Sequence, residues 1–262
     1  MRNRHPKYRP RQNLGFTLVE ILIALVIGLF LMGALLTIVQ ANRIAFGNQN
    51  KLAQLQDSER MAMTMMTDVI QSAGYFPQPW VNTLAGSLTA SGPFAVGQPV
   101  YGTYAPGAPG DSISVRYMTM GQDGILNCSG QSNAAPIGTN VLYVNTFQVM
   151  TPPASTTSQL VCSLTVNGGA PTQYNLVNGV TQLSILYGVK ASAGATGNSV
   201  DTYMSADQVT ANNLWGSVIS ALVQLTFTNP MYVASQPTNA FNQPTVSLQR
   251  VIGVMNQTGP MQ

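Results

Sequence analysis

The sequence predicts an α+β protein in which a long N-terminal helix, transmembrane in its first half, packs against a C-terminal antiparallel β-sheet. An uncharged apolar run over residues 21–39 is long enough to cross a bilayer as a helix. No proline occurs between Pro10 and Pro77, so nothing interrupts a helix over residues 16–73. Beyond Asp111, short segments of alternating apolar and polar residues, separated by turn residues, indicate antiparallel strands.

Basic residues precede the apolar run, at Arg2, Arg4, Lys7, Arg9 and Arg11. The positive-inside bias holds such a segment in the cytoplasm, so the chain after the span is expected to face outward. The apolar run is longer than the roughly 7 to 15 residues in the core of a secretory signal peptide. Glu20 stands at the cytoplasmic end of the span, where a carboxylate costs roughly 2.5 to 3.5 kcal/mol on insertion scales. Such a residue is a functional candidate that requires a partner.

The second half of the predicted helix is amphipathic. From Gln40 the sequence becomes polar, and Gly74 is the expected end of the helix. Apolar residues recur there at spacings of three and four and predict one stripe for the outer domain to cover. These residues are Leu52, Leu55, Ala62, Met66, Val69 and Ala73. The nearby methionines are interpreted as core packing, because methionine is an adaptable core residue; they are Met61, Met63, Met65 and Met66.

The chain after the helix divides into a loop and a sheet. Residues 76–109 are rich in Pro, Gly and Ser, which predicts an irregular loop that could carry partner specificity. Period-two alternation then predicts the strands of one antiparallel sheet, one face of which covers the helix stripe. The predicted strands are 112–119, 140–147, 160–166, 183–189, 219–227 and 246–252.

The charge distribution argues against a nucleic-acid partner. The net charge of +3 comes from the basic N-terminal segment, since without its cations six Lys/Arg remain against eight Asp/Glu. In the outer domain Arg116, Lys190 and Arg250 are scattered singly and form no basic patch. Only 7% of residues are charged, against about 25% in ordinary soluble domains. The exterior is therefore expected to be polar, uncharged and suited to packing against similar subunits.

The two cysteines, Cys128 and Cys162, both lie beyond the predicted span, where an oxidising compartment favours one disulfide. It would close a loop of about 35 residues and stabilise the fold by roughly 3 to 4 kcal/mol in the chain-entropy model. Two unpaired buried thiols are the alternative. Two cysteines are too few for a zinc site, and the single histidine, His5, lies in the basic leader.

No catalytic constellation can be assembled from the outer domain. With His5 in the leader, no Ser–His or Cys–His pair can form. Four carboxylates remain, on Asp111, Asp123, Asp201 and Asp207. The last two could offer oxygen ligands to calcium with neighbouring amides of Asn198, Asn212 and Asn213, but their spacing matches no EF-hand and solvated loop residues are the favoured interpretation. We predict no enzyme activity, no cofactor and no metal.

The segment Gly15-Phe16-Thr17-Leu18-Val19-Glu20 resembles the processing site of type IV prepilins and pseudopilins. The resemblance implies that a prepilin peptidase cuts after Gly15 and methylates the new amine of Phe16. It also implies that Glu20 pairs with the terminal amine of a neighbouring subunit. Phe16 and Glu20 are four residues apart and share a helix face, so a pair in low dielectric would specify axial register. The alternative is that Glu20 lies in the headgroup region of an ordinary signal anchor.

The same resemblance implies a division of the chain. It gives a leader peptide over 1–15, a long helix over 16–73 with its transmembrane half at 16–39, and an outer β-rich domain over 74–262. Type IV pilins have a long N-terminal helix whose outer half is wrapped by an antiparallel sheet. Further along, residues 179–188, residues 201–203, Trp215 and Arg250 resemble the PilW group of minor pilins.

The expected function is that of a minor pilin in the initiation or tip complex of a type IV pilus. The resemblance implies a bacterial inner-membrane protein with one span, a periplasmic outer domain and later extracellular exposure in the pilus. Its expected partners are the prepilin peptidase, the assembly platform, other minor pilins, the major pilin and a tip adhesin.

Two alternatives have the same predicted span. One is a J-type minor pseudopilin of a type II secretion system. The other is a secreted or anchored enzyme or binding protein with a signal sequence cleaved after Ala41. An N-methylated Phe16 at the mature N-terminus would favour a pilin, and Asn42 would favour a signal peptide.

Overall fold

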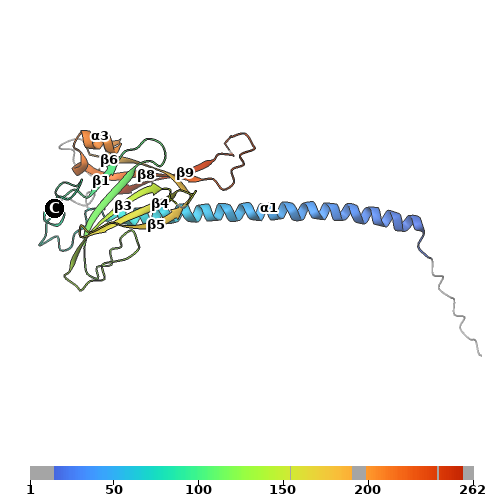
Figure 1. The fold of residues 1–262 in the computed structure, drawn as a ribbon, viewed down its shortest axis with the longest axis horizontal. Coiled ribbons are helices and arrows are strands. Elements are labelled where there is room, and N and C mark those ends of the chain that lie inside the picture. The colour runs from blue at the N-terminus through green and yellow to red at the C-terminus, as the bar shows by residue number, and fades with distance from the viewer. Residues whose placement is uncertain (1–14, 154, 191–198, 241, 256–262) are drawn as a thin grey trace, which may run out of the picture. The chain divides into compact units, whose positions relative to one another are not determined.

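The structure is a computed structural model that describes residues 15–153, 155–190, 199–240 and 242–255 (Figure 1). Its contacts divide the chain into two compact units, Met1–Asn50 and Lys51–Gln262. The long helix α1, Leu18–Gln71, contributes residues to both units.

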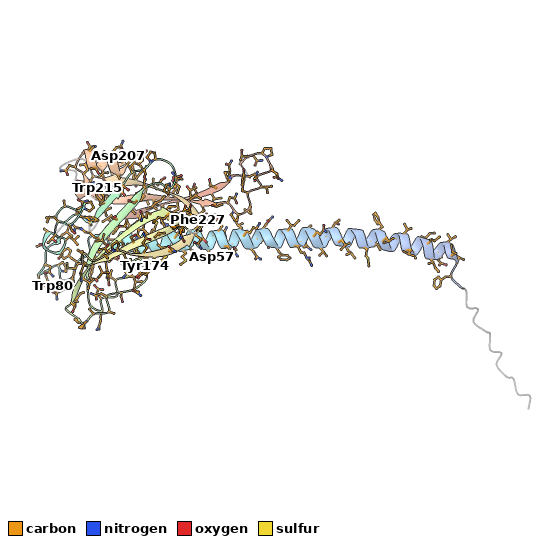
Figure 2. All side chains as sticks on the ribbon, viewed as in Figure 1. Asp57, Trp80, Tyr174, Asp207, Trp215 and Phe227 are labelled. Carbon is orange, nitrogen blue, oxygen red and sulfur yellow. A yellow bond between two sulfur atoms is a disulfide. The ribbon has the colours of Figure 1, made fainter. Side chains whose placement is uncertain are left out.

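In the first unit, α1 begins with a side-chain cap. The backbone N–H of Glu20 donates to Thr17 Oγ1 at 3.3 Å and to the Thr17 carbonyl oxygen at 3.1 Å. Thr17 and Glu20 have the spacing of a capping box, in which Thr, Ser or Asp precedes the helix and Glu stands three residues later. The described residues of this unit are all exposed, and their side chains project outward all round the helix (Figure 2).

In the second unit, the last turns of α1 bury one face. Five of the six predicted stripe residues are buried, namely Leu55, Ala62, Met66, Val69 and Ala73. The prediction was wrong at Leu52, which is 38% exposed because the buried face starts one turn later. Met63 and Ile70, outside the predicted stripe, are fully buried, so the covered face is wider than a three-and-four spacing suggests.

The second unit, Lys51–Gln262, is called the outer unit and contains two antiparallel sheets (Figure 1). The first has the strand order β1-β2-β3-β4-β5 and the second the order β7-β6-β8-β9. The first comprises β1 (Val100–Thr103), β2 (Ser112–Met120), β3 (Asn140–Met150), β4 (Gln159–Val166) and β5 (Thr172–Asn178). The second comprises β6 (Val180–Val189), β7 (Thr202–Met204), β8 (Val218–Thr228) and β9 (Thr245–Gly253). The short helices are α2 (Leu84–Ser87), α3 (Ala206–Ala211) and the 3-10 turn η1 (Trp215–Ser217).

The expectation of a single sheet was wrong, and Gly179 marks the division. It separates β5 from β6 with a φ of +82°, a conformation that favours glycine, and β6 then pairs with β8 instead of β5. The two sheets meet where the Asp111 N–H donates to the Leu183 carbonyl oxygen at 2.8 Å. A Cβ at Gly110 would collide with that same oxygen, so the close approach requires glycine.

Side chains of both sheets and of the α1 face form one core. Tyr117 and Phe147 come from the first sheet, Tyr187 and Phe227 from the second, and Met66 from the helix. Each of these residues is at most 1% exposed. All six predicted strands are present, whereas β1, β5 and β7 were missed. β1 lies in the Gly- and Pro-rich segment, β7 has only three residues, and β5 has mostly exposed side chains without clean alternation.

Candidate functional site

The predicted cleavage point lies on open backbone just before α1. Gly15 and Phe16 precede the helix, and the Phe16 side chain is 79% exposed. A Cβ built at Gly15 would meet nothing within 4 Å in the structure. The peptide bond between these two residues is therefore accessible to another protein in the described part of the chain.

Glu20 stands in the first turn of α1 beside the unpaired N–H groups of the helix start. A carboxylate at this end of a helix interacts favourably with the helix dipole. The ion pair between Arg60 and Asp57 does not involve Glu20, which has no cationic partner among the described residues. A shallow hollow of about 420 Å³ surrounds it, lined by Thr17, Val19, Glu20, Ile23, Ala24 and Ile27. The carboxylate thus lies on an exposed apolar helix surface where a cation from another chain can reach it.

The capping role of Thr17 was not recognised from the sequence. The Thr-Leu-Val-Glu spacing was the signal that could have revealed it. The cap gives the Glu20 backbone N–H an intrahelical partner but leaves the carboxylate without an ionic one. The helix cap therefore leaves the Glu20 carboxylate available for a partner from another chain.

α1 is the one helix among the described residues that is long and apolar enough to cross a membrane. None of the residues in its most apolar window is buried by the rest of the protein. Its outward apolar side chains include Ile21, Leu25, Leu29 and Leu36. A helix that is apolar all round and uncovered matches either lipid or a bundle of similar helices.

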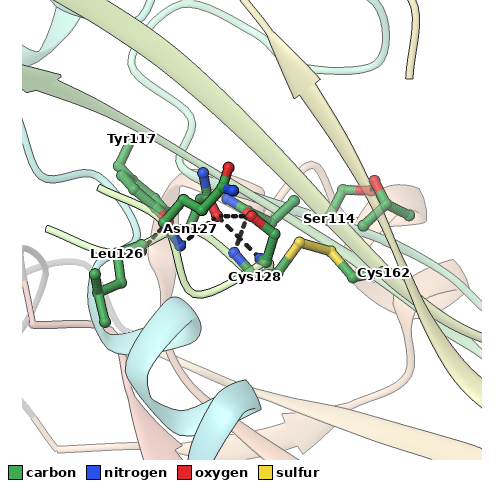
Figure 3. Close-up of a disulfide and its surroundings, with 10 residues drawn as sticks. Ser114, Tyr117, Leu126, Asn127, Cys128 and Cys162 are labelled. Atoms are coloured by element: carbon green, nitrogen blue, oxygen red, sulfur yellow. Dashed lines mark hydrogen bonds between the residues drawn. A yellow bond between two sulfur atoms is a disulfide. The ribbon is translucent and has the colours of Figure 1, made fainter. Parts of the chain in front are cut away.

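In the outer unit, Cys128 and Cys162 form a disulfide with Cα atoms 6.4 Å apart (Figure 3). Cys128 lies in the loop between β2 and β3. Cys162 lies in β4, opposite Phe147 of β3. The Cys128 N–H donates to Asn145 Oδ1 at 2.9 Å, and the Tyr117 hydroxyl donates to the Leu126 carbonyl oxygen at 2.6 Å. The covalent bond and these hydrogen bonds attach the loop to the first sheet.

Three of the four carboxylates considered as acids or metal ligands, Asp111, Asp123 and Asp207, accept hydrogen bonds from backbone or hydroxyl groups. Asp111 accepts the N–H groups of Ala105 at 2.9 Å and Ile185 at 2.7 Å. Asp123 accepts the N–H groups of Met120 and Ile125, and Asp207 accepts the Ser205 hydroxyl before α3. Asn198 lies outside the described residues. No group of three or more His, Cys, Asp or Glu suited to a metal occurs in the described ranges.

Arg116, one of the three singly scattered cations of the outer domain, is fully buried. Its guanidinium donates to the carbonyl oxygens of Gln98 at 2.7 Å and Thr89 at 2.6 Å, and also to those of Leu88 and Ala95. Burial lowers the pKa of Arg116 to about 10, so the side chain remains cationic at neutral pH. The residue therefore fixes the 88–98 loop on the first sheet. No local pattern indicated its burial, because period-two alternation places Arg116 on the strand face opposite Val115 and Tyr117.

A surface hollow of about 680 Å³ lies where α1 ends and the predicted specificity loop begins. Its lining includes Tyr75, Phe76, Pro77 and Trp80 from the segment after α1, together with Met120 and Ile125. Trp80 is 80% exposed. The 76–109 segment therefore exposes apolar surface to solvent, and its 88–98 part is bound to β2 through Arg116.

Comparison with known proteins assigns these features to a class. Residues 10–36 match the family described as Prokaryotic N-terminal methylation motif, and residues 146–251 match Type IV Pilus-assembly protein W. A solved structure, the type IV-like pilin TTHA1219 from Thermus thermophilus, is similar with 14% sequence identity and a TM-score of 0.40. The similarity covers 78% of this chain and 98% of that one. No curated protein matches the chain.

The apolar N-terminal helix, its methylation motif and the antiparallel sheets define a type IV pilin-like protein. The second match runs from within β3 to within β9. The chain resembles PilW over this stretch, and the two matches together indicate a minor pilin of a type IV pilus. Such proteins are typically structural and non-enzymatic.

Proposed function

We propose that this minor pilin is made as a precursor, cut after Gly15 and methylated on the new amine of Phe16. Glu20 then pairs with the Phe16 amine of a neighbouring subunit. The observation that carries the proposal is the state of Glu20, which lies in the first turn of an uncovered apolar helix without an ion pair among the described residues. A carboxylate buried in a helix bundle is strongly destabilising unless it finds a countercharge.

The proposed division of the chain follows from this role. Residues 1–15 form the leader, 16–73 form the long helix with its transmembrane half at 16–39, and 74–262 form the outer domain. The protein resides in the bacterial inner membrane with a single span and with its outer domain in the periplasm. After assembly the outer domain is extracellular, where an oxidising environment suits the bond between Cys128 and Cys162.

The proposed place of the chain is the initiation or tip complex of the pilus. Its partners there are other minor pilins, the major pilin and a tip adhesin. Before assembly it interacts with the prepilin peptidase, and during assembly with the pilus assembly platform. The low content of charged residues, 7%, supports extensive contact with similar subunits, because uncharged polar surfaces are desolvated more easily than charged ones.

The mature N-terminus tests the proposal directly. Mass spectrometry of protein isolated from the membrane and from sheared pili should find N-methylated Phe16 as the first residue. An N-terminus at Met1 in pili would contradict processing. An N-terminus at Asn42 would contradict the whole assignment, because the apolar helix would then be a removed signal sequence.

A further inference from the structure

β9 is one of the two edge strands of the second sheet, and one of its sides is paired with no other described strand. It pairs with β8 over its full length from Thr245 to Gly253 without any shift of register. No other described segment pairs with its second side. Regular edge strands of this length present a row of backbone donors and acceptors that another strand can use.

Hydrogen bonds just outside both ends of β9 show which groups form this row. The Val254 N–H donates to the Ile219 carbonyl oxygen at 2.9 Å, and the Asn229 N–H donates to the Pro244 carbonyl oxygen at 2.9 Å. Opposed antiparallel residues alternate between hydrogen-bonded and non-bonded pairs. The even-numbered residues of β9 therefore bond to β8, and the odd-numbered ones direct their N–H and C=O groups outward.

The outward groups belong to Thr245, Ser247, Gln249, Val251 and Gly253. None of these residues is proline, so each has an N–H to donate. The first four have exposed side chains, and Val251 is 55% exposed. Neither a bulge nor a proline protects this edge.

We propose that an extended segment of a neighbouring pilin-like subunit adds to β9 as a further strand. A row of alternating donors and acceptors is satisfied most completely by another extended backbone. The other described sheet edges fit this role less well. β1 and β7 have four and three residues, and β5 has a register shift against β4 between Leu160 and Val161.

Arg250 specifies the chemistry of the incoming strand. It lies opposite Val223, which is fully buried, so Arg250 occupies the core-facing side of β9. Its side chain is nevertheless exposed, and Nη1 lies 3.5 Å from Thr67 Oγ1 of α1. Within the described residues it has no carboxylate partner. A strand added at this edge therefore matches β9 when it places an acidic side chain beside Arg250.

The residues around Arg250 on the same face are apolar. Leu248 is partly buried against the core and Ile252 is buried. The matching segment thus has apolar residues two positions before and after its acidic residue. Its opposite face lies beside Ser247 and Gln249 and is expected to be polar.

This inference rests on the proposed entry of the chain into a pilus complex, and hydrogen exchange can test the two separately. The full-length processed protein is measured in detergent, first alone and then in the complex isolated with the other pilin subunits. We expect amides of Ser247, Gln249 and Val251 to exchange at least about tenfold more slowly in the complex, whereas amides of β5 change little. Complex formation without protection of β9 overturns the inference alone, and absence of any complex overturns both.

A matched pair of variants tests the backbone contact. Gln249→Pro removes an outward N–H without removing a bond to β8, and Gln249→Ala removes the side chain but retains the N–H. We expect recovery of the complex to fall about tenfold for Gln249→Pro and to remain near wild type for Gln249→Ala, with thermal unfolding of the isolated proteins confirming that both fold. Equal recovery of Gln249→Pro and wild type, or equal loss in both variants, overturns strand addition.

The charge requirement has its own test. Arg250→Glu should reduce recovery of the complex about tenfold, and Arg250→Lys should retain most of it. Photo-crosslinking from position 251 then identifies the bound chain by mass spectrometry. A crosslink to an extended segment of another pilin subunit or a second copy supports the proposal, and a crosslink to an unrelated protein overturns it.

Discussion

The guanidinium carbon of Arg116 lies 4.7 Å from the centre of the Phe94 ring. The same guanidinium donates to four backbone carbonyls between Leu88 and Gln98. A buried cation is strongly destabilising unless carbonyl dipoles and an aromatic face replace its lost hydration. This arrangement makes one side chain of β2 the organiser of a loop that has little regular structure.

Arg116→Leu should therefore destabilise the outer unit by about 3 kcal/mol, because several buried carbonyls lose their donors. The 88–98 loop should also become the first site of limited proteolysis. Urea unfolding under oxidising conditions measures the first effect and peptide mapping the second. Arg60→Leu is the matched control, since its pair with Asp57 is exposed and should leave the urea midpoint unchanged. Equal midpoints for wild type and Arg116→Leu would contradict the organising role.

Stability should fall as the pH rises through about 10, the usual pKa of tyrosine in an unfolded chain. Burial raises the pKa of four tyrosines in the fold, so the unfolded state loses these protons first and is favoured at alkaline pH. They are Tyr75, Tyr117, Tyr143 and Tyr187. Arg116, with its pKa lowered to about 10, acts in the opposite direction, because its buried cation is neutralised first in the folded state.

The four tyrosines outnumber Arg116, so the free energy of unfolding is expected to fall between about pH 9 and pH 11.5. Urea unfolding across this range measures the slope, and Tyr187→Phe should make it shallower by about one proton. A stability that rises over this interval would mean that Arg116 dominates, and would contradict the burial effect of the tyrosines.

Loss of the bond between Cys128 and Cys162 should destabilise the outer unit by roughly 3 to 4 kcal/mol in the chain-entropy model. Replacing both residues with serine should also expose the 121–139 loop to proteases. Mass mapping without reduction should recover one linked peptide pair from the wild-type protein. Free thiols at both positions in protein isolated under oxidising conditions would refute the pairing.

Gly15→Val should leave a full-length precursor in the membrane, because the peptidase must approach backbone that has no side chain. Gly28→Ala, inside the predicted span, is the control and should be processed normally. Immunoblotting of membrane fractions separates the two lengths. Efficient cleavage of Gly15→Val would refute the proposed processing site.

Glu20→Ala should give normal membrane levels and normal cleavage but weak association with other pilins and few surface pili. Insertion does not require the carboxylate, whereas a desolvated amine in the assembled bundle requires a countercharge. Co-purification from detergent and a count of pili measure the two effects. Thr17→Ala is the informative control, since it removes the helix cap but retains the carboxylate. If Thr17→Ala lowers assembly as much as Glu20→Ala, the role of Glu20 is to stabilise its own helix.

The location of the helix and of the longer strands could be predicted from local patterns. Ile113, Val115 and Tyr117 alternate because β2 has one face in the core, and all three are buried. Period-two alternation is a property of a strand by itself, so neighbouring sequence is sufficient to reveal it. The predicted cleavage segment is similarly local, since Gly15 lies just before α1 and Glu20, five positions further on, lies in its first turn.

The sequence by itself thus determined the order of parts, namely a basic segment, an apolar helix with Glu20 at its start, and a β-rich domain with two cysteines. Only the tertiary structure decided that the strands form two sheets and that Arg116 is buried. It also decided that β9 has an edge which no other described strand pairs with, and that Arg250 lies on its core-facing side. Each of these depends on contacts between residues far apart in the chain, such as Asp111 with Ile185 and Arg116 with Thr89. Periodicity along the chain shows which face of a strand is buried, but it does not show which strand or loop lies against that face.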